Sequence, residues 1–493
     1  MQSAKGLAAL VLLVAWPFLH FAAQNAYLGV SYPRLLVTAL GCLSLAILMI
    51  LALAWAFRRI RFYRWTAVVG SGFVALFLFE PLALIMQEYG FFRYHQAAVY
   101  PSLVLVMIAS VFLLSRSKEF VNKLLVVSIA INVFAFTPLV FDNNLSSVDS
   151  SVTQSQAGQN PTKAGGPLPN VYLLIFDEYA RIDQLEKIFG IENEPFLQDL
   201  ETRGFVVSRT SLANFPATIL SVASTLSMNL IVQEGDVFNW MGLDNRRAKR
   251  IIDGYNNVVR RFRQLGYSYA HGGGESYVRC GNAEDLCIRA KSFTWMTEQE
   301  RVLMLMTPFR LLRYRLKFQT EKFVPAVVGA TLQRMSRKPW FMYAHFMVPR
   351  SPTYDKNCVT FGGLDGLLGP RTLPRQDPEL MALRKAQYVT DIKCLNSDIL
   401  ELIDTILSSS ENPVIIIQSD TGPTYLRDWK NPDWPEDEFL ERYGILNAVR
   451  LPQHCRQFLY PKMTPVNIFR VVFACIEGKE PEYIDDVSIL TSY

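Results

Sequence analysis

Long apolar segments fill the first 141 residues of the chain. Each is near the roughly 20 residues that a helix needs to cross a bilayer, whereas the part after Asp142 has the composition of an ordinary globular protein. Residues 1–141 are therefore predicted to form an α-helical transmembrane domain. Its five predicted spans are Gly6–Ala23, Leu35–Phe57, Trp65–Met86, Ala97–Leu114 and Leu124–Phe141.

Basic residues in the loops predict how these spans are oriented. Lys and Arg gather in the loops after the second and fourth spans, whereas the alternate loops carry only Arg34 and Arg93. Because cytoplasmic loops collect basic residues, we expect the amino terminus inside the cytoplasm and everything after Asp142 outside it. The short first span is also compatible with a signal peptide whose basic end is Lys5, and that alternative leaves the downstream topology unchanged.

The cysteines agree with an oxidising compartment for the second half of the chain. Six of the seven cysteines follow Asp142, and an even number there indicates three disulfides. Sequence alone does not choose among the possible pairings, but it favours Cys280–Cys287 and Cys455–Cys475, which leaves Cys358–Cys394. A structural zinc site is the rival interpretation, although no Cys-x-x-Cys spacing supports it.

Composition separates a linker from a second folded domain. Residues 142–168 are rich in Ser, Gln, Asn, Gly and Pro, which predicts a flexible linker, and residues 169–493 are predicted to form an extracytoplasmic domain. The net charge of +5 is mild, and no basic stripe with interleaved aromatic residues suggests nucleic-acid binding. Few charges lie within the spans, which argues against a transporter.

Two apolar runs in this domain end in acidic residues. Val171–Phe176 is followed by Asp177 and Glu178, and Pro413–Gln418 is followed by Asp420. Such runs are typical of buried parallel strands, and they predict an α/β domain with a mostly parallel central sheet flanked by helices. Ligands bind at the carboxyl ends of such strands, so two acids delivered there would form half of an oxygen-rich metal site. The alternative is that these acids are surface residues that begin loops.

Three further side chains are candidates for chemistry. Thr218 falls in the first turn of a helix that Pro216 opens, where unpaired N–H groups and the helix dipole suit a hydroxyl nucleophile that handles phosphate or sulfate. The alternative is a capping or packing threonine, because Ser and Thr are ordinary residues at helix starts. His345 and Arg350 accompany another buried-strand pattern and could bind an anionic ligand, although His345 could also be a core histidine with satisfied hydrogen bonds.

Residues 295–328 mix apolar side chains with several arginines. This pattern predicts a basic amphipathic helix, either on the bilayer surface near anionic lipids or over the core of the outer domain.

The order of these segments resembles the sulfatase and alkaline phosphatase superfamily, especially its membrane-anchored lipoteichoic acid synthases and phosphoethanolamine transferases. The resemblance runs over Pro169–Asp486 and rests on the segments PNVYLLIFDEYAR, ANFPATILSVAS, YAHFMVPRSP and VIIIQSDTGP, the last followed by ERYGILNA and TPVNIFR. It implies an alkaline-phosphatase-like fold outside a bacterial plasma membrane. It also implies membrane lipid as a partner, and an anionic lipid or glycan as the substrate.

The resemblance assigns roles to individual residues. It implies that Asp177 is an acidic metal ligand, that Thr218 is the nucleophile and also touches the metal, and that Asp420 is the acid of a late Asp-His-Gly motif. His345 matches a histidine of a segment that usually reads His-x-x-x-Pro-His-x-Pro, and we expect it and Arg350 to bind substrate. The implied cofactor is one divalent cation, Mn, Zn or Mg.

Two departures from the family pattern leave the activity open. Thr421 replaces the histidine of Asp-His-Gly, and Arg350 replaces the second histidine of the Pro-His-x-Pro segment. Thr is a poor substitute for imidazole, and Arg stays protonated and cannot ligate a metal, although it can hold the oxygens of an anion. Two hypotheses follow: a metal-dependent transferase or hydrolase of phosphate or sulfate esters that works through Thr218, or a catalytically degenerate protein with a binding or scaffolding role.

Overall fold

The computed structural model describes most of both predicted domains. The residues that the structure describes are 2–25, 31–79, 96–141, 168–233, 243–273, 283–289, 300, 303–304, 306–308, 318–320, 328–329, 331–335, 339–350, 353–362, 378–426 and 433–490. The chain divides into two compact units. The first is Met1–Ser155 with Thr294–Leu316, and the second is Gln156–Phe293 with Lys317–Tyr493. All but the last residue of the predicted linker lies outside the described residues.

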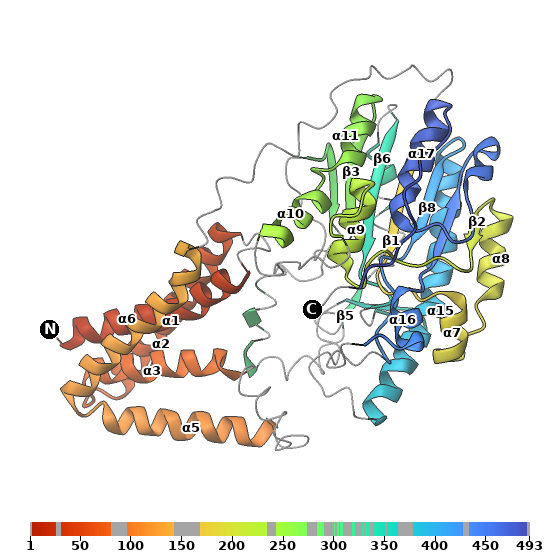
Figure 1. Ribbon diagram of the computed structural model, residues 1–493. Helices are drawn as coiled ribbons and strands as arrows, with labels where there is room; N and C mark the ends of the chain where they lie inside the picture. The colour runs from red at the N-terminus through yellow and green to blue at the C-terminus, as the bar shows by residue number, and fades with distance from the viewer. Residues whose placement is uncertain are drawn as a thin grey trace. The chain divides into compact units, whose positions relative to one another are not determined.

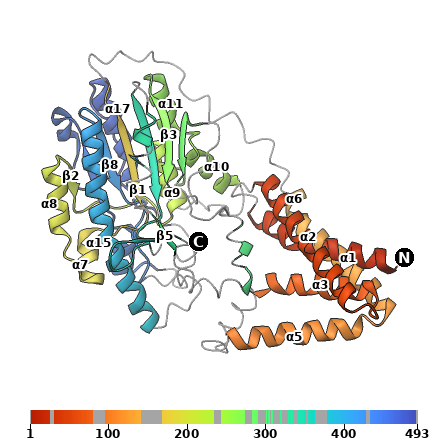
Figure 2. The ribbon, with the colours of Figure 1, turned by 180° about the vertical axis from the view of Figure 1, so that it is seen from behind.

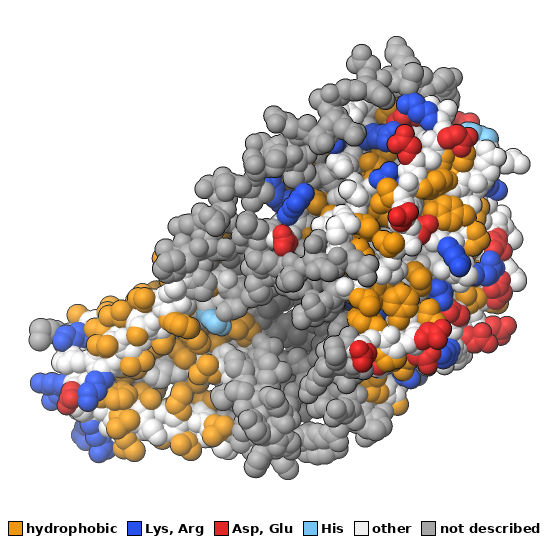
Figure 3. All heavy atoms as spheres, viewed as in Figure 1, with side chains coloured by type: hydrophobic (Ala, Val, Ile, Leu, Met, Phe, Trp, Pro, Cys, Tyr) orange, Lys and Arg blue, Asp and Glu red, His pale blue; other side chains and the backbone are white. Residues whose placement is uncertain are grey.

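The first unit has a helix at each of the five predicted spans. They are α1 (Gln2–Asn25), α2 (Tyr32–Ala56), α3 (Phe62–Phe77), α5 (Gln96–Leu114) and α6 (Lys118–Phe141). Three of the described helices, α1, α2 and α6, are long and apolar enough to cross a membrane. The described helix at the third span, α3, is 16 residues long, and residues 80–86 of that predicted span lie outside the described residues. Figure 3 shows apolar side chains over much of the visible face of this unit.

Basic side chains join the helix ends at one end of this unit. Lys5 Nζ donates to Asn122 Oδ1 at 3.0 Å, and Arg64 donates to Ser115 Oγ at 3.2 Å and to the Phe112 carbonyl at 2.8 Å. The amino terminus and the α2–α3 and α5–α6 connections lie together at that end (Figure 1). This arrangement agrees with the loops expected on the cytoplasmic side.

The second unit is built on a seven-stranded sheet with the order β2-β9-β8-β1-β6-β3-β4. β1 runs parallel to β6 and β8, and β3 runs parallel to β4 and β6, whereas β9 is antiparallel to β2 and β8. The predicted fold class, a helical membrane domain followed by an α/β domain with a mostly parallel sheet, is therefore confirmed. The strands are β1 (Val171–Phe176), β2 (Val206–Ser208), β3 (Ser268–Gly273), β4 (Leu286–Arg289), β6 (Trp340–Phe346), β8 (Val414–Gln418) and β9 (Asn447–Arg450), with β5 (Phe318–Thr320) and β7 (Thr360–Gly362) in a separate pair.

Helices cover both faces of this sheet (Figures 1 and 2). β1 is buried along its whole length: Tyr172, Leu174 and Phe176 pack on the side of α7, α8 and α15, and the alternate residues pack on the side of α9, α10, α11 and α17. Each such apolar side chain contributes about 1.5–3 kcal/mol when buried. The helices are α7 (Ile182–Phe189), α8 (Glu194–Thr202), α9 (Thr218–Ser227), α10 (Leu243–Ile252), α11 (Asn257–Gln264), α15 (Pro378–Ser409), α16 (Glu436–Tyr443) and α17 (Ile468–Glu477), with short 3₁₀ turns at Gln453–Phe458 and Pro465–Asn467.

The segment that begins at Glu441 has a sequence pattern that predicts a strand, and this prediction is wrong at its start. Glu441, Arg442 and Tyr443 end helix α16, and strand β9 begins at Asn447. Helix α16 begins directly after Pro435 and has three acidic residues in its first turn, which complement the positive end of the helix dipole.

The structure contains two of the three predicted disulfides within the described residues. Cys358 is bonded to Cys394, and Cys455 is bonded to Cys475. Cys287 is also disulfide-bonded, while its predicted partner, Cys280, lies outside the described residues.

Candidate active site

Three neighbouring strands deliver the acids and the histidine to one place. Asp177 follows β1 and Asp420 follows β8, while His345 is the last but one residue of β6. Because these strands are parallel neighbours, their carboxyl ends share one edge of the sheet. A ligand atom of Asp177, one of His345 and one of Asp420 all lie within 4.8 Å of one another, and all three residues are buried.

Thr218 is the first residue of helix α9, as the sequence predicted. Its hydroxyl lies 3.3 Å from Arg350 Nη1 and close enough to Asp420 to lower the pKa of that carboxyl. A hydroxyl at a helix start is near unpaired backbone N–H groups, which suit an anion. The structure thus brings Thr218 together with Asp420 and Arg350.

Arg350 occupies the space between the nucleophile candidate and the first acid. Its Nη1 lies 3.0 Å from Asp177 Oδ2 as well as near Thr218, and its Nε lies 3.5 Å from Glu178 Oε1. The position of its backbone is also determined, because Arg350 N donates to the Asp177 carbonyl at 3.0 Å. A guanidinium here can hold two oxygens of a phosphate or sulfate ester beside the Thr218 hydroxyl.

Burial dominates the electrostatics of this cluster. It raises the pKa of Asp177 to about 6, and the nearby Arg350 guanidinium offsets only part of that rise. It also raises the pKa of Asp420, with Thr218 and Arg350 opposing it, and lowers the pKa of His345 to about 4. At neutral pH Asp177 is therefore mostly ionised and His345 is neutral, which is the form of imidazole that ligates metals.

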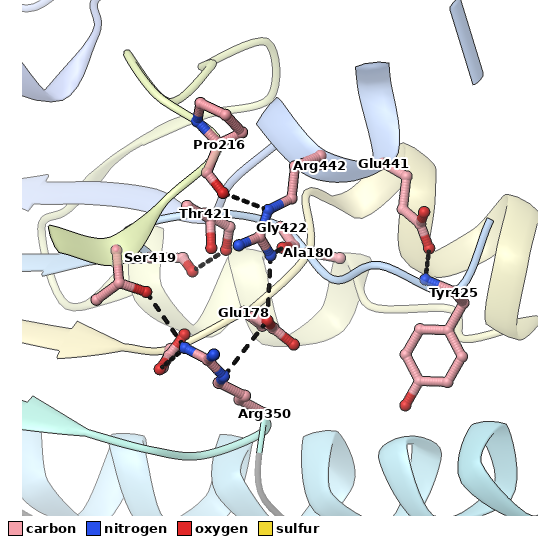
Figure 4. Close-up of polar contacts among 12 residues, drawn as sticks. Glu178, Ala180, Pro216, Arg350, Ser419, Thr421, Gly422, Tyr425, Glu441 and Arg442 are labelled. Atoms are coloured by element: carbon pink, nitrogen blue, oxygen red, sulfur yellow. Dashed lines mark hydrogen bonds and ion pairs between the residues drawn. The ribbon is translucent and has the colours of Figure 1, made fainter. Parts of the chain in front are cut away.

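Glu178 and Arg442 were not recognised from the sequence as parts of the site. Glu178 was interpreted as a solvated neighbour of Asp177, but its side chain is only 13% exposed, and its Oε1 accepts from Arg442 Nη1 at 3.1 Å. Its backbone has a φ of 63°, which is uncommon for a residue other than glycine. Figure 4 shows Glu178 between Arg350 and Arg442. Nothing in a single sequence indicates that an acidic residue after a buried strand will adopt a positive φ or be buried.

No other described histidine takes the place that Thr421 leaves in the motif. Thr421 is buried and its Oγ1 has no hydrogen-bond partner among the described residues, while its carbonyl accepts from Ser419 Oγ at 2.7 Å. The next residue must be glycine, because a Cβ on Gly422 would lie 1.9 Å from the Glu441 carbonyl oxygen. The loop that carries Thr421 therefore packs closely against the end of helix α16. The Thr421 side chain in it is buried and is not a metal ligand of ordinary strength.

A divalent cation nevertheless fits the side chains that are present. Asp177 Oδ1 is buried and has no hydrogen-bond partner among the described residues. Neither oxygen of Asp420 accepts a hydrogen bond of ordinary geometry from them, although Thr218 is close. Two carboxylates and a neutral imidazole form a donor set suited to Zn or Mn. His345, expected from the sequence to bind substrate, is thus better placed to ligate a metal.

Two more acids and two more histidines of this domain are candidates to replace the missing ligand, but each has another partner or lies elsewhere. Asp183 pairs with Arg181 at 2.7 Å, and Asp355 accepts from backbone N–H groups of its own turn. His271 stacks against the ring of Tyr343 at 5.1 Å. His454 is exposed beside Cys455 and Cys475, whose sulfurs are bonded to each other.

Comparison with known proteins gives similarity at the level of structure. No known family model matches the chain, and no curated protein does. Among solved structures, the zinc complex of the C-terminal periplasmic domain of EcEptC from Escherichia coli is 13% identical, with a TM-score of 0.42, over 66% of this chain and 88% of that one. Lipooligosaccharide phosphoethanolamine transferase A (EptA) from Neisseria meningitidis, an integral membrane protein, is 11% identical, with a TM-score of 0.41, over 96% and 95%.

A third structure, the phosphonate monoester hydrolase of Agrobacterium radiobacter, is 12% identical with a TM-score of 0.42, over 65% of this chain and 79% of that chain. A protein of the alkaline phosphatase superfamily from Vibrio parahaemolyticus is also found, with 12% identity and a TM-score of 0.40. All four have low identity to this chain, whose chemistry follows from its own side chains.

Proposed function

We propose that this protein is a membrane-anchored enzyme that transfers or hydrolyses a phosphate or sulfate ester through Thr218, with its α/β domain outside the cytoplasm. The observation that supports it most is the position of the Thr218 hydroxyl. It lies at the start of a helix, 3.3 Å from the Arg350 guanidinium and beside the buried Asp420 carboxylate. This arrangement combines a nucleophile, an anion-binding cation and a candidate metal centre.

The charges of the site favour a substrate with one negative charge. Three carboxylates, those of Asp177, Glu178 and Asp420, lie near two guanidinium groups, and His345 is neutral. The three carboxylates and two guanidinium groups together carry one negative charge. One divalent cation held by Asp177, His345 and Asp420 would change the net charge of the site to plus one. A phosphodiester or a sulfate ester would neutralise it, whereas a doubly charged phosphate monoester would not.

The residues suggest how the reaction proceeds. Arg350 holds two ester oxygens, the Thr218 oxygen forms a bond to phosphorus or sulfur, and the bond to the ester oxygen of the leaving alcohol breaks. Thr218 gives up its proton to the buried carboxylates and the departing alcohol takes up a proton, so none is released. The oxygen of water or of an acceptor hydroxyl then bonds to phosphorus or sulfur, the bond to the Thr218 oxygen breaks, and the proton of the attacking hydroxyl passes to Thr218, which restores its hydroxyl. A bound divalent cation would supply neutralisation of the charge that develops on the transferred group.

Turnover by the purified full-length protein in detergent tests this proposal. We expect Mn- or Zn-dependent release of nitrophenol from bis-p-nitrophenyl phosphate or p-nitrophenyl sulfate, and slower release from p-nitrophenyl phosphate. Thr218→Ala should lower the rate by at least about 10³-fold, as expected for loss of a nucleophile.

The matched control for this variant is Thr225→Ala. Thr225 is a buried threonine of the same helix that bonds to the Ser221 carbonyl, and its variant should keep the wild-type rate. Turnover that persists in Thr218→Ala would overturn the role of Thr218. A wild-type protein that binds no divalent cation and turns over no ester would instead support the non-catalytic alternative, which the Arg350–Asp177 ion pair favours.

A further inference from the structure

Arg442 joins the three loops that carry the site. Its side chain is only 5% exposed, and it donates to Glu178 Oε1 at 3.1 Å, to the Pro216 carbonyl at 2.7 Å and to the Gly422 carbonyl. Its own carbonyl accepts from Gly422 N at 2.7 Å. Figure 4 shows the guanidinium directed toward Pro216, Gly422 and Glu178.

Each of these contacts lies next to a site residue. Glu178 follows Asp177, Pro216 precedes Thr218 by two residues, and Gly422 follows Asp420 by two. A buried guanidinium with several donors in a rigid plane sets distances between its acceptors that a flexible ammonium group cannot set. Arg442 therefore sets how the two acid loops and the start of helix α9 lie relative to one another.

Glu178 relays this position to the anion-binding group. The same carboxylate oxygen, Oε1, lies 3.1 Å from Arg442 Nη1 and 3.5 Å from Arg350 Nε, and Arg350 reaches Asp177 and Thr218 through Nη1. The carbonyl of Glu178 is held as well, because it accepts from the Tyr388 hydroxyl at 2.8 Å. The chain of contacts runs from Arg442 through Glu178 to Arg350.

We infer that Arg442 is a positioning residue of this site: through Glu178 it aims the Arg350 guanidinium at the anion, and through the Pro216 and Gly422 carbonyls it places Thr218 and Asp420. This inference rests on the proposed function. Arg442 contacts no reacting atom in this arrangement and acts through its neighbours. Small displacements of catalytic groups are costly, so its loss should affect the rate more than the fold.

The test compares Arg442→Gln with Arg450→Gln in the full-length protein. Arg450 also donates to two backbone carbonyls, those of Arg203 and Pro413. Pro413 directly precedes β8, so these contacts lie at the amino-terminal end of that strand, whereas the site lies at its carboxyl end. We expect Arg442→Gln to lower kcat about 10–100-fold, as loss of outer contacts to site ligands does, and to weaken inorganic phosphate binding about tenfold. Arg450→Gln should change neither quantity.

A double variant separates positioning from general stability. If Arg442 acts through Glu178, Arg442→Gln combined with Glu178→Gln should lose little more than the stronger single variant, because the two act as one unit. Additive losses would show independent roles and overturn the inference. Arg442→Lys should recover part of the rate, and it replaces Arg442→Gln in the comparison should the latter not fold.

Two measurements keep this result separate from the proposed function. If the wild-type protein turns over ester and Arg442→Gln stays within about twofold of it, the positioning role fails and the proposed function stands. If the wild-type protein turns over no ester, the proposed function fails, and phosphate binding by calorimetry decides the role of Arg442. Unchanged phosphate affinity in Arg442→Gln, or no phosphate binding by the wild-type protein, would overturn it.

Discussion

The Tyr343 hydroxyl contacts one of the two ring nitrogens of His345. The Tyr343 hydroxyl lies 3.0 Å from His345 Nδ1, and a hydroxyl can accept as well as donate. When it accepts the Nδ1 proton, Nε2 carries the lone pair and can ligate a metal, which is the usual role of such an outer contact. The phenol therefore matters for metal binding although it is no ligand itself.

We predict that Tyr343→Phe weakens the affinity for Zn or Mn about 10–100-fold, measured by isothermal titration of the full-length protein. The matched control is Tyr269→Phe. Tyr269 is also fully buried on the sheet, and its hydroxyl has no hydrogen-bond partner among the described residues. Its removal should leave metal affinity unchanged. Equal affinities for the two variants would contradict the tautomer role of Tyr343.

At the scale of elements, helix α15 anchors the segment that follows Arg350. Asp391 accepts from Thr353 N at 3.0 Å and from Tyr354 N at 2.8 Å, and the Tyr354 hydroxyl donates to Asp398 at 2.7 Å. The disulfide between Cys358 and Cys394 joins the same segment to the same helix. Three contacts with one helix thus fasten the chain that leaves the site.

Asp391 makes this anchor dependent on pH. Burial raises its pKa to about 7, and the backbone N–H groups of Tyr354 and Thr353 offset only part of the rise. A pKa raised in the folded state means that the folded state binds the proton more tightly. The stabilisation from Asp391 is therefore complete below about pH 4 and is lost as the pH rises toward 7.

We predict that Asp391→Asn, which stays neutral and keeps the acceptor for both N–H groups, gains stability relative to the wild type as the pH rises from about 4 to 7. The gain should be on the order of a few kcal/mol. Thermal unfolding of both proteins across this range measures it. Asp404→Asn on the same helix should show no such gain over this range, because the hydrogen bond to Arg203 lowers the pKa of Asp404, and the stability that Asp404 contributes is lost only as the pH falls below about 4. A pH-independent difference for Asp391→Asn would disprove the assignment.

At the scale of the whole molecule, the parts that sequence could predict are those that depend on local pattern. Fully buried parallel strands appear in a sequence as unbroken apolar runs, so strands β1 and β8 could be predicted. The proximity of Asp177 and Asp420 could be predicted as well, because the carboxyl ends of parallel strands lie at the same side of a sheet. Thr218 was recognisable from the polar turn before an apolar helix. The five helices of the first unit were predicted from length and hydropathy alone.

The parts that sequence could not predict depend on how distant segments meet. No local pattern around Arg442 predicts a buried arginine, and its burial arises only because the loops around Glu178, Pro216 and Gly422 converge on it. The position of His345 beside Asp177 and Asp420 likewise requires the register between β1 and β6, which pairs Ile175 with His345. A single chain carries no local signal for either.

A segment from the middle of the chain belongs to the first unit. Leu303 is 3% exposed and packs in the same apolar cluster as Leu10 and Leu35, with Met306 beside it. Thr38 Oγ1 donates to Glu300 Oε1 at 3.3 Å. Glu300, Leu303 and Met306 of the predicted amphipathic segment thus group with the helices of the first unit. The helix prediction was wrong further along this segment, because Phe318–Thr320 forms strand β5 and Val328 packs in the core of the second unit. Leu303 and Met306 follow the 142–168 segment in the chain but pack against helices that precede it. They therefore hold the chain after the linker to the membrane helices by a contact that does not depend on the linker.

We predict that this attachment survives when the covalent one is cut. With a protease site placed within residues 142–167, the two fragments of the cleaved wild-type protein should stay associated in detergent on size-exclusion chromatography. Leu303→Asp should raise the separated fraction, because it removes about 1.5–3 kcal/mol of apolar burial and buries a charge. Leu383→Asp, the same change at a side chain that is 64% exposed on α15, should not. Fragments that separate fully in the wild-type protein would show that Leu303 and Glu300 contribute no lasting attachment, and that the linker alone holds the α/β domain to the membrane helices.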